Sequence, residues 1–387
     1  MSIKEFRGLN NVTDAMRLDM RWLVQADNID VSNTGGLSKR KGYSPYLSGT
    51  AFTAHTTQDF QRMYAIDGGT LKAVTGPGAA TPLRTGISSA TMYWTEVNDQ
   101  VFFNNGTDSG VIQPDSSVLP WAWPVPGAPS VQAVTGQLPS GLYRVCCTYT
   151  LADGRETGAG SATEFVLAQG RGLQITGIPQ SAGLATNLYI APANSTVFQY
   201  AGSPTTSALV WNSPSDTLGA DLLTPFLDPL PAGSTVVQHW GGRIYAAQYL
   251  PQSDQTVVWF SQPLGYHLFD LNEDFFMVPG QASMLAWHAD ALLIGTNLAV
   301  HAFDGKSLGL LAAYGVVPGQ HWSVDGQRTL FWTLRGLCAA LPFKNLTEGY
   351  VSVAPGVSAG GALVLSGGQK RYLVALRQGG TAFNSRT

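Results

Sequence analysis

The sequence predicts an all-β protein, a β-propeller into which a second, smaller β-sandwich is inserted. Three observations predict it. The chain holds 44 Gly and 22 Pro, and only 12% of its residues are charged, about half the usual 25% of soluble domains. Short apolar and aromatic segments alternate with Gly, Asn and Asp turns, which is typical of hairpins. At 387 residues the chain exceeds the roughly 250–300 residues that one core supports.

The hairpins recur with a regular period. Successive centres lie about 40–50 residues apart, the period of propeller blades. One long interval, between Phe102 and Tyr245, interrupts the series and predicts an insertion. The predicted centres are Tyr64, Phe102, Tyr245, Leu293, Phe331 and Tyr372.

Proline-rich segments bracket the insertion. The entry is Val125-Pro-Gly-Ala-Pro129 and the exit is Phe226-Leu-Asp-Pro-Leu-Pro231, which leaves about 100 residues, the size of a small β-sandwich. Strand-like segments at 141–150, 173–178 and 187–191 resemble fibronectin type III or related immunoglobulin-like modules. We therefore expect residues 1–125 and 231–387 to form a propeller of about six blades, and residues 126–230 the inserted module.

Helical periodicity is confined to one segment, Thr13 to Gln25, where Ala15, Met16, Met20 and Leu23 predict a short amphipathic helix. The cysteines predict no disulfide framework, because Cys146, Cys147 and Cys338 are odd in number and two are adjacent. We expect no secretory signal, because the first residues lack an apolar core segment. We expect no membrane-spanning helix either, because no apolar run approaches the ~18–20 residues that span a bilayer. We expect folding in a reducing cytoplasm.

Charge is distributed unevenly along the chain. The net charge is −3, which does not mark a strongly basic nucleic-acid binder. Residues 328–387 carry seven basic side chains and the single acidic Glu348. Residues 245–305 carry no Lys or Arg and six acids, Asp254, Asp270, Glu273, Asp274, Asp290 and Asp304. The acidic and the basic region fit either complementary faces of neighbouring subunits in a ring or scattered solvated loops.

The N-terminal segment carries the most specific pattern. Phe6-Arg-Gly-Leu-Asn-Asn11, Ala26-Asp-Asn-Ile-Asp30 and Gly35-Gly-Leu-Ser-Lys-Arg-Lys-Gly-Tyr43 occur in order. This order resembles the start of bacteriophage tail nozzle and packaged-DNA stabilisation proteins. A second similar stretch begins at Trp259-Phe-Ser-Gln-Pro-Leu-Gly-Tyr and continues through Phe276-Met-Val-Pro279 and Leu293-Ile-Gly-Thr296.

The resemblance implies a non-enzymatic structural protein of the virion tail, assembled in the bacterial host cytoplasm. Its subunit would form a homo-oligomeric ring, most often a hexamer, that is part of the DNA channel and retains or releases the genome. The implied partners are tail adaptor or portal-side ring proteins, tail fibres or spikes that contact the inserted domain, and genomic DNA in transient, non-specific contact. No cofactor, metal or catalytic residue is implied.

Two groups of charged residues are the candidate channel or subunit-interface sites. The first is Lys39, Arg40 and Lys41, where alternation predicts that Leu37 and Tyr43 point inward. A solvated edge that discourages strand pairing is the alternative for this triplet. The second group is Asp270, Glu273 and Asp274.

Other functions remain open at this stage. Trp240, Trp259, Trp287 and Trp322 could serve as stacking platforms in a receptor- or glycan-binding propeller, and the same three carboxylates could serve a glycan-cleaving one. No pair of histidines has metal-ligand spacing. Three histidines that adjoin tryptophans, His239, His288 and His321, are predicted to pack at the core.

Overall fold

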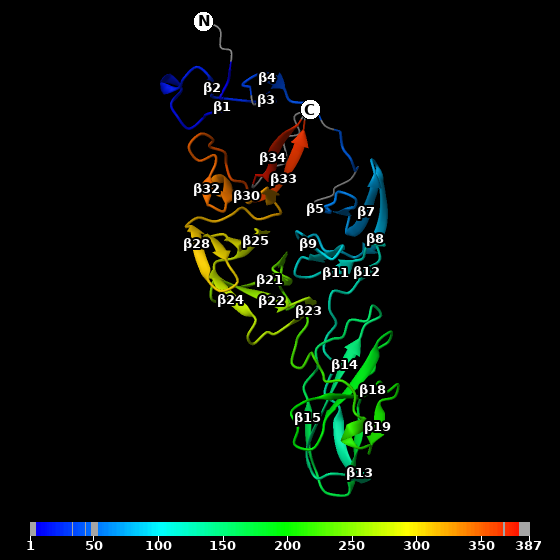
Figure 1. Cartoon of the computed structure of the whole chain (residues 1–387). Coiled ribbons are helices and arrows are strands. Elements are labelled where there is room, and N and C mark those ends of the chain that lie inside the picture. The colour runs from blue at the N-terminus through cyan, green and yellow to red at the C-terminus, as the bar shows by residue number, and fades with distance from the viewer. Residues whose placement is uncertain (1–4, 33, 43, 48–52, 367, 379–387) are drawn as a thin grey trace.

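Runs of β-branched and aromatic residues between Gly and Asn turns fold as small antiparallel sheets. The structure, a computed structural model, describes residues 5–32, 34–42, 44–47, 53–366 and 368–378. Its architecture is all-β, as predicted, and the succession of small sheets is that of a β-propeller-like fold. Figure 1 shows the sheets following one another around an arc. A lobe forms one end of the molecule, and the N-terminal segment lies at the opposite end.

Six sheets make up the arc, numbered here along the chain. Sheet 1 contains β5 (Thr53–Thr56), β6 (Met63–Asp67), β7 (Thr70–Gly76) and β8 (Ala79–Thr85). Sheet 2 contains β9 (Tyr93–Val97), β10 (Gln100–Asn104), β11 (Ser109–Ile112) and β12 (Val118–Leu119). Sheet 3 contains β20 (Val236–Trp240), β21 (Arg243–Leu250), β22 (Gln255–Gln262), β23 (Gly265–Phe269) and β24 (Phe275–Pro279).

The second half of the arc follows without interruption. Sheet 4 contains β25 (Ala282–Trp287), β26 (Leu292–Thr296), β27 (Val300–Phe303) and β28 (Leu308–Ala312). Sheet 5 contains β29 (Ser323–Asp325), β30 (Arg328–Thr333), β31 (Gly336–Ala340) and β32 (Lys344–Asn345). Sheet 6 contains β33 (Ser358–Ser366) and β34 (Gln369–Arg377). Each predicted hairpin centre, from Tyr64 to Tyr372, lies on the second strand of its sheet.

The lobe is formed by strands between sheets 2 and 3. Its three-stranded sheet contains β13 (Ser130–Leu138), β16 (Arg171–Thr176) and β19 (Ala208–Trp211). Its four-stranded sheet contains β15 (Thr163–Leu167), β14 (Gly141–Thr150), β17 (Ala185–Ala191) and β18 (Gln199–Gly202), and a 3₁₀ turn, η2 (Ser215–Thr217), follows β19. Its two hydrophobic clusters draw only on residues of the lobe, so the lobe buries an apolar core of its own.

Apolar side chains hold neighbouring sheets of the arc together. One cluster joins sheets 1 and 2, a second joins sheets 2, 3 and 4, a third joins sheets 4 and 5, and a fourth joins sheets 5 and 6. Burial of these faces between sheets is the main favourable term for such an architecture. Among the described residues no such cluster links sheet 6 back to sheet 1.

The prediction of a helix from Thr13 to Gln25, within the N-terminal arm of residues 5–41, is wrong. The arm contains only a 3₁₀ turn, η1 (Ala15–Arg17), and the short strands β1 (Gly8–Leu9), β2 (Trp22–Leu23), β3 (Ile29–Val31) and β4 (Leu37–Lys39). Side chains of Asn10, Asp14 and Asp19 accept hydrogen bonds from nearby backbone amides. These local bonds compete with helical ones, and no neighbouring element covers Met16, which is 96% exposed.

The predicted inward direction of Leu37 is also wrong, because its side chain is 41% exposed. The β3–β4 hairpin has no layer beneath this face, so strand alternation alone did not decide which face is buried. Gly35 adopts a positive φ of 78° at the reversal, the conformation that glycine tolerates best. Tyr43 lies outside the described residues.

Candidate interaction surfaces

The basic triplet Lys39, Arg40 and Lys41 lies at the end of the β3–β4 hairpin, and all three side chains are exposed. The Arg40 amide donates to the Asn28 carbonyl at 2.8 Å, which fixes the backbone of the triplet beside β3. No ion pair links any of the three to another described residue. The hairpin therefore presents three unneutralised cations to solvent.

The acidic candidates lie in the turn between β23 and β24 but differ in environment. Asp270 accepts hydrogen bonds from the amides of Asn272 and Glu273, so it stabilises the turn. Asp274 accepts from Arg243 at 3.2 Å and from Gln262 at 2.6 Å. Glu273 is exposed. Glu273 is thus the member of this group left available for an outside contact.

The basic C-terminal region is largely neutralised within the chain. Asp325 pairs with Lys370 at 2.8 Å and with Arg328 at 3.2 Å. Arg371 reaches Asp30 of the arm at 2.8 Å, and Arg335 pairs with Glu348 at 3.3 Å. Because Asp325 and Asp30 lie outside the basic segment itself, the sequence did not show this compensation.

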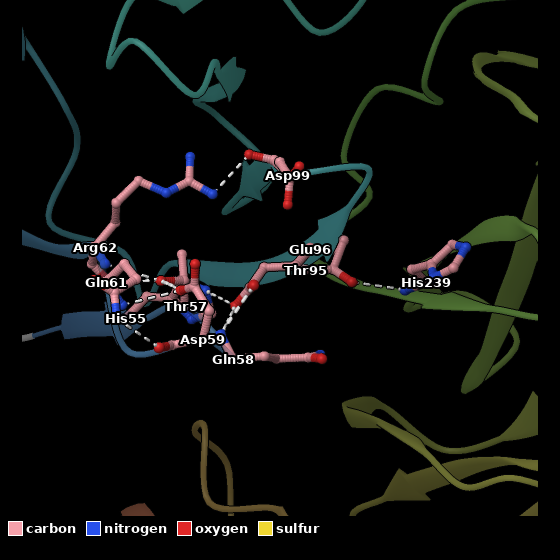
Figure 2. A network of polar contacts seen from close by, with 10 residues as sticks. All are labelled: His55, Thr57, Gln58, Asp59, Gln61, Arg62, Thr95, Glu96, Asp99 and His239. Atoms are coloured by element: carbon pink, nitrogen blue, oxygen red, sulfur yellow. Dashed lines mark hydrogen bonds and ion pairs between the residues drawn. The ribbon is translucent and has the colours of Figure 1, made fainter.

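A polar network between sheets 1, 2 and 3 was not predicted from the sequence (Figure 2). The His55 Nε2 atom lies 2.9 Å from Glu96 Oε1, and the Gln58 amide donates to Oε2 of the same carboxylate at 3.0 Å. Arg62 donates to the Asp99 carbonyl at 2.8 Å.

The same network reaches sheet 3, because the His239 amide donates to Thr95 Oγ1 at 2.7 Å. Its members come from β5, from the β5–β6 turn, from β9 with its following turn, and from β20, which are far apart in the chain. The network fixes the position of adjacent sheets, and a structural role accounts for these residues.

The lobe is tied to the arc by polar contacts rather than by a flexible linker. The Arg155 guanidinium donates to the Pro120 carbonyl at 2.8 Å, and His267 Nε2 donates to the Glu156 carbonyl at 2.9 Å. A backbone bridge joins Asp228 to Phe269. These bonds join the lobe to the arc at and beside β23, so the junction holds the lobe in one orientation.

An open cleft of about 670 Å³ lies at this junction, lined by Arg144 and Phe226 among others. Asp228 also lines it, and burial together with the nearby Asp270 carboxylate raises the pKa of Asp228. The cleft is open to solvent and has no convergent set of reactive groups among its lining residues. It does not resemble an enclosed ligand site.

Three of the four tryptophans proposed as stacking platforms, Trp240, Trp259 and Trp322, are engaged inside the chain. Trp240 packs on Tyr245 and donates to the His288 carbonyl at 2.8 Å. Trp259 packs on Phe275 with ring centroids 5.0 Å apart. Trp322 packs against the cluster between sheets 4 and 5. Ring faces used in this way serve packing.

Two of the three histidines beside tryptophans are buried, as predicted: His288 and His321. Burial lowers the pKa of His321 to about 4. The described residues hold no group of His, Cys, Asp and Glu placed to bind a metal ion. Within the same residues no helix is long and apolar enough to cross a membrane. The three cysteines are buried free thiols.

Together, the sheets and surfaces define an all-β, propeller-like protein whose distinctive features are exposed arms and turns. No protein-family model matches the chain, and no curated protein matches it. Among solved structures, apo AztD from Citrobacter koseri is 12% identical, with a TM-score of 0.31, over 88% of this chain and 91% of that one. PorZ, a surface component of the type-IX secretion system of Porphyromonas gingivalis, is 12% identical, with a TM-score of 0.23, over 89% and 55%.

Proposed function

We propose that the protein is a tail nozzle subunit of a bacteriophage, a structural component of the virion that forms part of the DNA channel. In this proposal sheets 1 to 6 are the blades of a six-bladed propeller. Residues 126–230 are an inserted immunoglobulin- or fibronectin-III-like module. Subunits form a homo-oligomeric ring, expected to be a hexamer, and carry out no enzymatic reaction.

The observation that carries the proposal is the N-terminal arm. The three segments on which the resemblance to nozzle proteins rests span residues 6–43. Their described residues lie at the end of the molecule opposite the lobe, and among them only Asn10 and Gly35 are buried (Figure 1). A long exposed arm with little buried surface is a feature of subunits that complete their packing in an assembly. Apolar side chains exposed elsewhere, such as Phe60 at 81% and Leu264 at 75%, support the same conclusion.

The mechanism we propose is mechanical. The arc of sheets supplies a rigid wall, because apolar clusters and the polar network of Figure 2 join neighbouring sheets. A mildly acidic chain suits a lumen through which DNA slides, since strong phosphate contacts would slow its passage. The lobe, fixed by the Arg155 and His267 contacts, would present one surface to tail fibres or spikes. The ring would dock on adaptor or portal-side proteins.

The test is imaging of the full chain, alone and in virions, by electron microscopy, with particle mass measured by light scattering. We expect a closed ring whose class averages match the distal density of the tail. Monomers at all concentrations, together with tail density that the ring does not fit, would overturn the proposal. A glycan-binding screen of the same protein would then test the receptor-binding alternative.

A further inference from the structure

The N-terminal arm carries apolar side chains that nothing in the chain covers. Within its described residues only Asn10 and Gly35 are buried. Ordering such a segment costs conformational entropy that its own contacts do not offset. The exposed apolar side chains are Val12, Met16, Met20, Val24, Ile29 and Leu37. The arm therefore lacks a surface on which these side chains would pack.

Contacts within the chain hold the arm at sheet 6 and away from the opposite side of the arc. Trp22 stacks on Tyr350 at 5.2 Å, and Asn11 Nδ2 donates to the Ser352 carbonyl at 2.9 Å. Figure 1 shows β3 and β4 beyond β34 and well separated from β24 and β28. The outer side of the arm is thus directed away from its own sheets 3 and 4.

Sheets 3 and 4 present an uncovered apolar surface along β24 and β28. Phe276 of β24 stacks on Phe303 of β27 with centroids 4.3 Å apart, and Leu308 lies opposite Phe303 in the register of β27 and β28. Leu308 is 38% exposed and Leu310 is 61% exposed. Phe276 is partly buried and packs against the core cluster of sheets 2 to 4. We call Phe276 and the exposed Leu308 and Leu310 beside it the β24–β28 surface.

A buried polar atom beside this surface also lacks a partner. His301 lies opposite Leu310 in the same register and is 8% exposed, yet its Nε2 atom has no hydrogen-bond partner among the described residues. An unpaired buried polar atom costs about 1–3 kcal/mol. Five side chains among the described residues hold such an atom, and that of His301 lies opposite the exposed Leu310.

The charges beside the β24–β28 surface indicate which segment would cover it. Glu273 precedes β24, and Asp304 opens the turn before β28, next to Phe303. Both carboxylates are exposed and form no ion pair with described residues. Asp304 also accepts hydrogen bonds from the amides of Lys306 and Ser307 and from the Ser307 hydroxyl, which hold its carboxylate at the start of the turn. The surface is therefore apolar with acidic groups at one end, which matches an arm that combines exposed methionines with Lys39, Arg40 and Lys41.

We propose that the N-terminal arm of one copy lies across the β24–β28 surface of a second copy, with its basic triplet against Glu273 and Asp304. This inference rests on the proposed ring. The arm and its receiving surface are different parts of the molecule, so the contact is head-to-tail. Repetition of such a contact closes a ring when the rotation between neighbours divides a full turn, and otherwise extends a filament. Each interface would supply the cover that both surfaces lack.

Charge reversal in both directions tests the contact in the full chain. One variant carries Lys39→Glu, Arg40→Glu and Lys41→Glu, and the other carries Glu273→Lys and Asp304→Lys. Each alone should weaken self-association about tenfold or more at low salt, since attractive pairs become repulsive. An equimolar mixture should assemble again, because each reversed arm then meets a reversed surface. Light scattering after size-exclusion chromatography measures the mass.

A matched control reverses exposed charges on the lobe, Arg171→Glu and Asp216→Lys, and should assemble like the unmodified chain. Cross-linking covers the case in which a reversed variant fails to fold. Copies with Arg40→Cys and copies with Asp304→Cys are mixed and treated with a bismaleimide, and a covalent dimer is expected. Asp216→Cys in place of Asp304→Cys should give none.

The outcomes separate this inference from the proposed function. Rings that assemble equally in all variants, with no cross-linked dimer, would overturn the arm contact and leave the ring intact. An unmodified chain that stays monomeric and fits no tail density would overturn the proposed function, and the arm contact with it.

Discussion

His321 is buried between sheets 5 and 6, and its titration makes the stability of this end of the arc depend on pH. Nε2 donates to the Val317 carbonyl at 2.7 Å, and Nδ1 accepts from the Trp332 amide at 3.0 Å. A protonated ring could not accept at Nδ1. Burial acts in the same direction and lowers the pKa of His321 to about 4, from an ordinary value near 6.5.

The size and sign of the effect follow from these two pKa values. As pH falls below about 6.5 the unfolded chain takes up a proton at this position, whereas the folded chain does so only near pH 4. The stabilisation is therefore fully present above pH 6.5 and is lost as the pH falls to about 4. One pH unit corresponds to about 1.4 kcal/mol, so the loss amounts to about 3 kcal/mol.

Urea unfolding at pH 7 and pH 4, followed by tryptophan fluorescence, measures this loss. His321→Gln removes the titrating group, so its free energy of unfolding should change by about 3 kcal/mol less between the two pH values than that of the unmodified chain. Val317→Ala is the matched control. It leaves a cavity in the same cluster and should lower stability equally at both pH values. A His321→Gln variant with unaltered pH dependence would refute the reasoning.

Two further predictions concern the lobe. Gly158→Ala would place a Cβ atom in the space of the Leu227 carbonyl. Limited proteolysis should therefore cleave the junction faster, whereas Gly127→Ala, where nothing lies within 4 Å, should leave the rate unchanged. Burial raises the pKa of Cys146 and Cys147 to about 12. Both thiols should resist iodoacetamide at pH 8 until the chain is unfolded, and mass spectrometry of the folded protein with either residue modified would contradict this.

Features set by local pattern were predictable. Alternating apolar residues and Gly turns placed the strand at 141–150, and β14 has the same bounds. Tyr64 and Phe331 were recognised as hairpin centres because a strand and its turn are adjacent in sequence. The sequence likewise indicated that the cysteines form no disulfide framework, and all of them are free.

Features that depend on distant segments were not predictable. Met16 and Met20 have helical spacing, yet no element packs against them, so the arm remains extended and exposed. The sequence also marked Asp270 and Asp274 as interface candidates. The structure shows that Asp274 is occupied by Arg243 and Gln262, which left Glu273 for the proposed contact.

The sequence by itself determined the all-β class, the repeat of hairpins and the uneven distribution of charge, because period-2 alternation, turn chemistry and composition act over a few residues. Only the tertiary structure decided which charges are neutralised, which apolar faces stay uncovered and which histidines are buried. Those properties depend on contacts between segments far apart in the chain, such as Asp30 with Arg371, and burial of a group is set by everything that packs around it.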